Sequence, residues 1–163
     1  MNEKEMNEAL EEESQLEFNR FDAGAAYQIG QYISGLAISR NLKLVVDISA
    51  FGKTLYHFSS DLAIPDNEHW AQRKKNTVMM FSHSTRYMAL KLDDNQSLLA
   101  DKYGLDPAEY AAVPGAVPIR LKNQGVIGAV AVSGMKPMED HQMAVSGIRR
   151  FLYPDEQNLN SAA

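Results

Sequence analysis

The stretch GAVPIRLKNQGVIGAVAVSGMKPMEDH, residues 115–141, carries the clearest structural pattern in the chain. Residues 116–121 and 126–133 are predicted strands joined by a short hairpin loop. The second strand is apolar on both faces, which is typical of a strand in the middle of a sheet. Gly134 then supplies a turn, and a helix begins near Pro137, because proline is favoured in a first helical turn. The stretch therefore predicts a hairpin, a turn and a helix in immediate succession.

The rest of the chain predicts one further hairpin and several helices. Apolar residues at helical spacing after the N-cap Asp22 predict a helix that ends near Arg40. Alternation in residues 42–49 and a second extended run predict an antiparallel strand pair. Start signals at Pro65 and a fresh cap at Ser84 predict two more helices. The expected ranges are strands 42–49 and 55–58 and helices 65–81 and 85–92, and the last helix has an inward stripe of Met138, His141, Val145, Ile148 and Leu152.

This order of elements decides the fold class. Helix, two strands, helices, two strands and helix show no sustained βαβ alternation, so we expect an α+β fold with an antiparallel sheet flanked by helices. The 163 residues fit a single domain. We divide the chain into an acidic N-terminal arm at 1–20, the domain at 21–154 and a C-terminal tail at 155–163.

Composition narrows the classes of function. The sequence has 45% hydrophobic and 23% charged residues, as in an ordinary globular protein, and its apolar runs fall short of the roughly 20 residues of a membrane span. It contains no cysteine, which favours a cytoplasmic location and excludes thiol chemistry. Outside residues 1–17 the net charge is near +1, so we expect neither nucleic acid nor membrane as a partner.

Residues 1–17 hold seven glutamates against the single Lys4, a net charge of -6. The preferred interpretation is a frayed, solvated helix, because charged terminal segments are usually mobile. The alternative is an arm that docks on a neighbouring subunit or another protein partner.

Several familiar active sites are excluded by inspection. The glycines at 125 and 128 lack the Gly-Lys-Ser/Thr of a phosphate loop, and no GxGxxG opens a helix. Ser133 lacks the leading glycine of a nucleophile elbow. The four histidines have neither cysteine partners nor the spacing of a helical zinc site, so we expect no metal site.

Trp70, Arg73 and Lys74 form the first candidate site. Their spacing places two cations and one indole on one helix face, which favours binding of a small or flat anion, and Asn76 follows as a further candidate. The alternative is a buried tryptophan flanked by the apolar stems of the two basic side chains.

The turn from Ser133 and Gly134 to Asp140 and His141 is the second candidate site. Backbone N–H groups at a tight turn before a helix start can bind an anion, and His141 could carry a proton. The alternative for His141 is a hydrogen-bonded core residue. We therefore take Trp70, Arg73, Lys74, Asn76, Ser133, Gly134, Asp140 and His141 as candidate ligand-binding residues, with His141 as the candidate catalytic residue.

Three sequence blocks carry a family resemblance. DNEHWAQRKKNTV at 66–78, LDPAEYAAVPGAVPI at 105–119 and GVIGAVAVSGMKPMEDH at 125–141 resemble the haem-degrading-domain superfamily, the GlcG- and HbpS-like proteins, and more closely its single-domain branch, an uncharacterised protein family. The resemblance implies a profilin-like α+β fold, a homo-oligomer and haem as a possible cofactor. Where this branch commonly has His-Gly-Gly, the chain has Val113, Pro114 and Gly115. Any ligand contact made by that histidine in relatives is therefore absent here.

Three hypotheses of function follow. The first is a cytosolic, oligomeric protein that binds haem or another flat or small anionic ligand between the Trp70 helix and the Gly134 turn. The second is a non-enzymatic scaffold for protein interaction. The third is an enzyme that uses His141 as acid and base on a small carboxylic acid.

Overall fold

The computed structural model describes residues 2–156, so residues 157–163 of the predicted tail lie outside the described part. Its elements are α1 (Glu3–Ser14), β1 (Glu17–Phe18), α2 (Ala23–Ser39), β2 (Val45–Ala50), β3 (Lys53–Ser59), α3 (Pro65–Phe81), α4 (Thr85–Lys91), α5 (Leu98–Asp101), β4 (Ala116–Leu121), β5 (Gly125–Ser133) and α6 (Pro137–Leu152).

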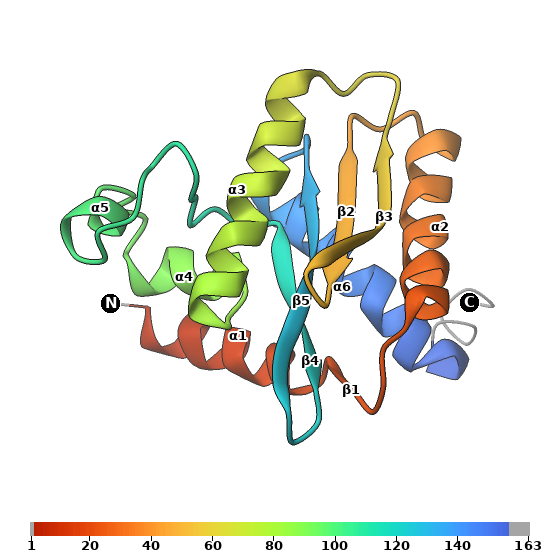
Figure 1. The fold of residues 1–163 in the computed structure, drawn as a ribbon, viewed down its shortest axis with the longest axis horizontal. Coiled ribbons are helices and arrows are strands. Elements are labelled where there is room, and N and C mark those ends of the chain that lie inside the picture. Colours follow the sequence, from red (N-terminus) through yellow and green to blue (C-terminus); the bar gives the residue numbers. More distant parts are fainter. Residues whose placement is uncertain (1, 157–163) are drawn as a thin grey trace.

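The strands form one five-stranded sheet in the order β1-β4-β5-β2-β3 (Figure 1). The two predicted hairpins, β2–β3 and β4–β5, are antiparallel, and β5 pairs with β2 in the centre. The α+β class is therefore confirmed. The sheet is mixed rather than wholly antiparallel, because the short strand β1 pairs in parallel with β4.

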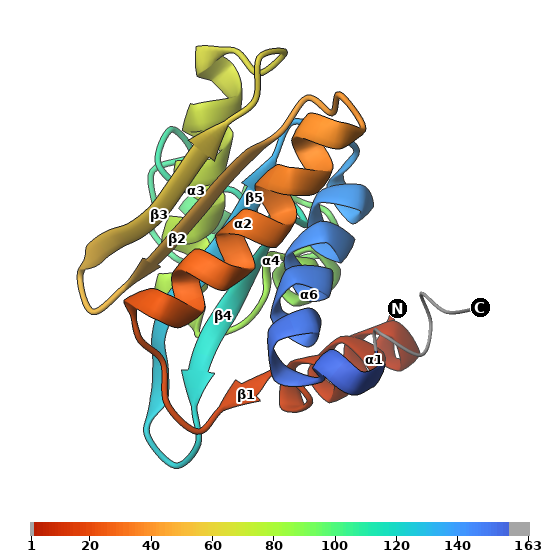
Figure 2. The same ribbon diagram turned by 90° about the vertical axis from the view of Figure 1, so that its right-hand side faces the viewer.

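Helices cover both faces of the sheet (Figures 1 and 2). The larger core lies under α2 and α6, where Ile33 and Ile148 meet Ile48 and Val132. A smaller core on the other face packs Val45 with alanines and Val78 of α3. Strand β2 is therefore buried on both faces.

Close backbone packing explains two of the glycines. A Cβ on Gly30 would stand 2.2 Å from the Tyr56 ring, so α2 approaches β3 too closely for any side chain there. A Cβ on Gly128 would stand 2.1 Å from the Ser49 carbonyl oxygen, so the neighbouring backbone of β2 leaves no space for a side chain there.

The inward stripe predicted for α6 is confirmed in part. His141, Val145 and Ile148 are buried, and Leu152 is partly buried against the larger core. Met138 is 40% exposed, so its predicted inward position is wrong. It lies in the first turn, next to Pro137, where α6 begins at the surface and only every third or fourth side chain faces the sheet.

The acidic helix α1 packs against the body, so the interpretation of a frayed, solvated helix is wrong. Ala9 and Glu13 are buried, and the Glu13 carboxylate accepts the backbone N–H of Ser84 at 3.0 Å and contacts His83 at 3.2 Å. Arg120 adds a longer contact with Glu13 at 3.9 Å. Partners on α4, β4 and the loop before α4 therefore hold α1 against the body, although the composition of α1 alone predicts exposure to solvent.

Candidate functional site

A cavity of about 210 Å³ lies where α3 and α6 begin. Both helices present residues of their first turns to it, and the end of β5 forms its floor. The sequence predicted five of its lining residues, namely Trp70, Lys74, Ser133, Gly134 and Asp140. It missed the other five, Asp66, Asn67, Val113, Met135 and Pro137. We call this cavity the helix-start pocket.

A buried ion pair forms one wall of this pocket. The Lys74 ammonium donates to the Asp140 Oδ2 atom at 3.0 Å and to the Val132 carbonyl oxygen at 3.1 Å. The two side chains are only 3% and 2% exposed. Burial lowers the pKa of Lys74 and raises the pKa of Asp140, and the attraction between the two opposes both shifts. An ammonium group has three N–H donors, so one remains beyond these two hydrogen bonds.

The turn at Gly134 connects β5 to α6 in a conformation that favours glycine. Gly134 has a φ of 118°, and a Cβ there would stand 2.5 Å from the Lys43 carbonyl oxygen. The Met135 N–H donates to Asp140 Oδ1 at 3.0 Å, so this carboxylate braces the turn as well as pairing with Lys74. The glycine therefore positions the start of α6 beside the pocket.

The Ser133 side chain links the end of β5 to the start of α3 through a hydrogen bond. Its hydroxyl group donates a short hydrogen bond to the Asn67 carbonyl oxygen, and Asn67 Oδ1 accepts the Ile64 N–H at 2.9 Å. The Ser133 hydroxyl is therefore a structural tether at the pocket floor, in agreement with the exclusion of a nucleophile elbow.

Trp70 and Arg73 share a helix face as predicted, but Arg73 does not line the pocket. Its guanidinium lies over the indole, 4.4 Å from the ring centroid, and donates to the Pro107 carbonyl oxygen at 2.8 Å. A longer contact reaches the Tyr110 carbonyl oxygen at 3.5 Å. The expectation of two cations facing one ligand is therefore wrong, because Arg73 holds the loop before β4 and Lys74 is ion-paired.

Asn76 lies away from the helix-start pocket. Its amide donates to the Glu109 carbonyl oxygen at 2.8 Å and accepts from Gln72 at 2.9 Å. One and a half helical turns separate it from Trp70, and it borders a different cavity beside β2. Its predicted place in the Trp70 site is wrong for that reason.

His141 is also absent from the pocket lining. It is 1% exposed, and its Nε2 atom lies 2.6 Å from Glu12 Oε1 on α1, while its Nδ1 atom is buried without a hydrogen-bond partner. Glu12 also pairs with Arg86 at 3.3 Å. Although burial opposes the shift, His141 and Arg86 lower the pKa of Glu12. His141 is thus the hydrogen-bonded core residue of the alternative interpretation, and its burial gives a substrate no access.

Two further features are absent from residues 2–156. None of the helices there combines the length and the apolar character that crossing a membrane demands. Within the same range, histidine and acidic side chains form no group of three or more suited to hold a metal ion.

The fold and the pocket define a small α+β domain with a cavity between two helix N-termini. The chain belongs to the family described as haem degrading protein HbpS-like, whose model matches residues 21–149. A UPF0303 protein of Paraburkholderia phymatum is 42% identical over 148 residues, which cover 91% of this chain and 90% of the relative. The predicted resemblance, including the uncharacterised branch, is confirmed.

Solved structures share the fold. The crystal structure of the Ybr137w protein has a TM-score of 0.80 and 31% identity, covering 90% of this chain and 88% of that one. The structure of a PduOC:heme complex has a TM-score of 0.66 and 16% identity, covering 78% and 92% of the two chains. At that identity the second likeness shows the fold alone.

Proposed function

We propose that the protein binds a small molecule with an acidic group in the helix-start pocket. The observation that carries this proposal is the Lys74 ammonium, which lines the cavity with one N–H beyond its two hydrogen bonds. Helices α3 and α6 both begin at the pocket, and the positive ends of their dipoles favour a negative ligand group. The part of the Trp70 indole that lines the pocket offers a flat apolar wall for the rest of the ligand.

Size and charge limit the ligand further. The volume of about 210 Å³ is below the roughly 300–1,000 Å³ of pockets that enclose drug-sized molecules. Asp66 at the exposed rim and Asp140 inside also line it, so a ligand that carries a hydrogen-bond donor beside its acid is favoured over a polyanion. A small aromatic or heterocyclic carboxylic acid meets these conditions.

Trp70 is the single tryptophan, so its fluorescence reports on this pocket directly. We expect nicotinate to change the fluorescence saturably and nicotinamide, its uncharged analogue, to have a much weaker effect. Val113→Phe, which places a larger side chain on the pocket wall, should remove the response, whereas Val113→Ala should keep it. An equal response of all three proteins would refute this site.

Haem is a second candidate, supported by the family description. The helix-start pocket does not fit an enclosed haem, because it is small and none of its lining residues is a histidine. We therefore expect that any saturable Soret shift in a haem titration does not depend on Trp70. The Trp70→Ala variant should give the same result as the unaltered protein. A shift lost in Trp70→Ala and kept in His141→Ala would restore haem as the ligand of this pocket.

We further propose that the protein forms a homo-oligomer, acts in the cytoplasm and can bind a protein partner. Two adjacent exposed methionines at the end of α3, Met79 and Met80, support an assembly surface. Light scattering should give a mass above the 18.2 kDa of one chain, and a monomer mass would exclude the assembly. Cell fractionation tests the location. The acid–base enzyme is not proposed, since its one candidate, His141, is buried under α1.

A further inference from the structure

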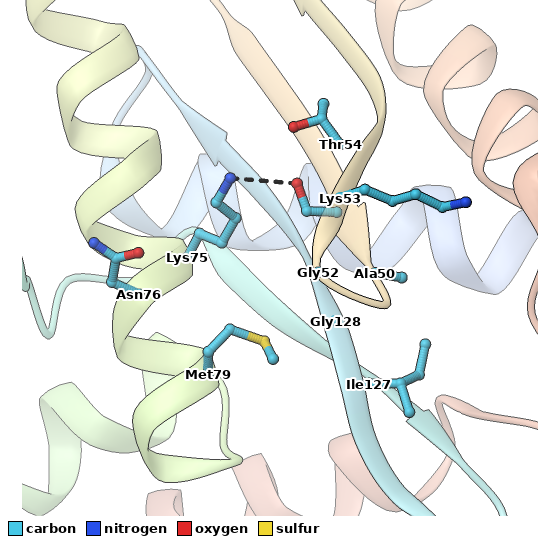
Figure 3. Close-up of a pocket in the computed structure, with 10 residues that line it drawn as sticks. Ala50, Gly52, Lys53, Thr54, Lys75, Asn76, Met79, Ile127 and Gly128 are labelled. Atoms are coloured by element: carbon cyan, nitrogen blue, oxygen red, sulfur yellow. Dashed lines mark hydrogen bonds between the residues drawn. The ribbon is translucent and has the colours of Figure 1, made fainter.

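A second cavity, of about 260 Å³, lies between the β2–β3 turn, β5 and α3 (Figure 3). It shares no lining residue with the helix-start pocket. Its lining includes two lysines and no acidic side chain, whereas the helix-start pocket has two aspartates and one lysine. We call it the hairpin pocket.

The polar end of the hairpin pocket is built around Lys75. Its ammonium donates to Asp47 Oδ1 at 3.1 Å and to Ser49 Oγ at 3.3 Å, which leaves one of three N–H donors. Figure 3 shows the Lys75 side chain extending from α3 toward the strands, while Lys53 extends away from Lys75. The hydroxyl-bearing Thr54 also lines this pocket. Lys75 is therefore the cation that a ligand would meet.

The nearby carboxylate of Asp47 does not cancel this cation. Asp47 does not line the pocket, and its Oδ2 atom lies 2.8 Å from His57 Nδ1. Burial opposes the shift, but the hydrogen bond to Asp47 and the charge of Glu68 raise the pKa of His57. The charge of Asp47 is thus shared between two basic partners, Lys75 and His57.

The other end of the hairpin pocket is apolar. Ala50, Ile127 and Met79 line it, and Met79 on α3 is 47% exposed. Polar and apolar ends in one cavity match a ligand that is itself amphipathic.

The turn between β2 and β3 carries backbone strain at the edge of this pocket. Phe51 and Gly52 have φ angles of 57° and 76°, the left-handed pair of a two-residue hairpin turn that ordinarily takes Asn-Gly. An exposed phenylalanine in that conformation costs stability, and such strain clusters at binding sites. Its two neighbours, Ala50 and Gly52, both line the pocket.

We propose that the hairpin pocket is a second binding site, for a small amphipathic carboxylate. The carboxylate accepts from Lys75 and Thr54, and the aromatic or short aliphatic part packs against Ala50, Ile127 and Met79. This site is independent of the one proposed at the helix starts, because Lys75 and Lys74 point into different cavities.

Amide chemical shifts of the ¹⁵N-labelled full chain test the proposal. We expect benzoate and hexanoate to move the signals of Gly52, Thr54 and Gly128 saturably, and benzamide and hexanamide to bind at least about fivefold more weakly. Trp70 fluorescence, recorded in the same titrations, reports separately on the helix-start pocket. Unmoved signals, or amides that bind as tightly as acids, would overturn the proposal.

A charge on the exposed wall provides a matched pair of variants. Met79→Glu adds a negative charge beside the ligand and Met79→Gln adds none, and neither disturbs the buried core. We expect benzoate affinity to fall about tenfold in Met79→Glu relative to Met79→Gln. Equal affinities in the two variants would contradict an anion site. Lys75→Met should likewise lose binding, while Lys122→Met, at an exposed lysine outside the pocket, should keep it within about twofold.

Discussion

Lys74 and Lys75 are neighbours in the sequence, and each pairs with an aspartate, at 3.0 and 3.1 Å. Consecutive residues on a helix point about 100° apart, so Lys74 faces α6 and the helix-start pocket while Lys75 faces β2 and the hairpin pocket. The Lys74 side chain is 3% exposed and the Lys75 side chain 14%. The same chemical pair is thus embedded to different depths.

The partners of the two aspartates differ even more than the exposure of the lysines. Asp140 has Lys74 as its basic partner, and its other contact is the Met135 N–H. Asp47 has Lys75, His57 and the Ser49 hydroxyl, which donates at 2.6 Å. The Asp140 carboxylate therefore depends on the Lys74 side chain alone for charge neutralisation, whereas Asp47 has other partners besides Lys75. The distance within an ion pair is therefore not enough to rank the two lysines by their contribution to stability.

The largest expected effect is that of Lys74→Met. It leaves the Asp140 carboxylate buried with no basic partner, which should lower the free energy of unfolding by about 3–5 kcal/mol. Urea denaturation measures the loss. The double variant Lys74→Met, Asp140→Asn removes both charges and should recover part of it. A cost below about 1 kcal/mol for the single variant would show that Asp140 is not held as an ion.

Lys75→Met should cost less, about 1 kcal/mol, because Asp47 keeps His57 and Ser49 as hydrogen-bond partners. The same urea titration gives the value, with Lys53→Met as the exposed control that should leave stability nearly unchanged. If Lys75→Met proved as costly as Lys74→Met, the contrast between a single-partner and a multi-partner carboxylate would fail.

The smallest expected effect is a pH dependence at His57. Its pKa is raised above 6.5 in the folded chain, so its contribution is fully present below that value and is lost as pH rises through the folded pKa. His57→Gln should therefore reduce stability more at about pH 6 than at about pH 9. Thermal unfolding at the two pH values measures the difference, and Glu68→Gln should reduce it. A pH-independent cost would mean that His57 serves Asp47 only as a neutral donor.

Much of the fold could be predicted, because local patterns decide it. The stretch at 115–141 gave the β4–β5 hairpin, the Gly134 turn and the start of α6 within a residue of their observed positions. Strand β1 could not be predicted, since two residues are too few to show a period of two. The position of α1 depends on Ser84, His83 and Arg120, which lie far along the chain, so its own composition was misleading.

The candidate site was predictable to the extent that helix geometry constrained it. Spacing placed Trp70 near Lys74, and the glycine turn predicted where α6 begins. Helix spacing could not predict that Arg73 would bind backbone carbonyl groups or that His141 would face Glu12. In both cases the partner comes from a distant segment of the chain. Nor could spacing reveal Lys75 as the residue of a separate pocket, since two adjacent lysines look alike in a sequence.

The contact between α1 and α6 has a consequence for how the chain folds during synthesis. Glu12 and His141 are 129 residues apart, and β1 waits for β4 to supply its neighbour in the sheet. Helix α1 leaves the ribosome well before α6, so Glu12 and His141 can meet only after the intervening residues have been synthesised. Docking of α1 is therefore a late step of folding, because contacts between distant segments must bear the entropy of closing a long loop.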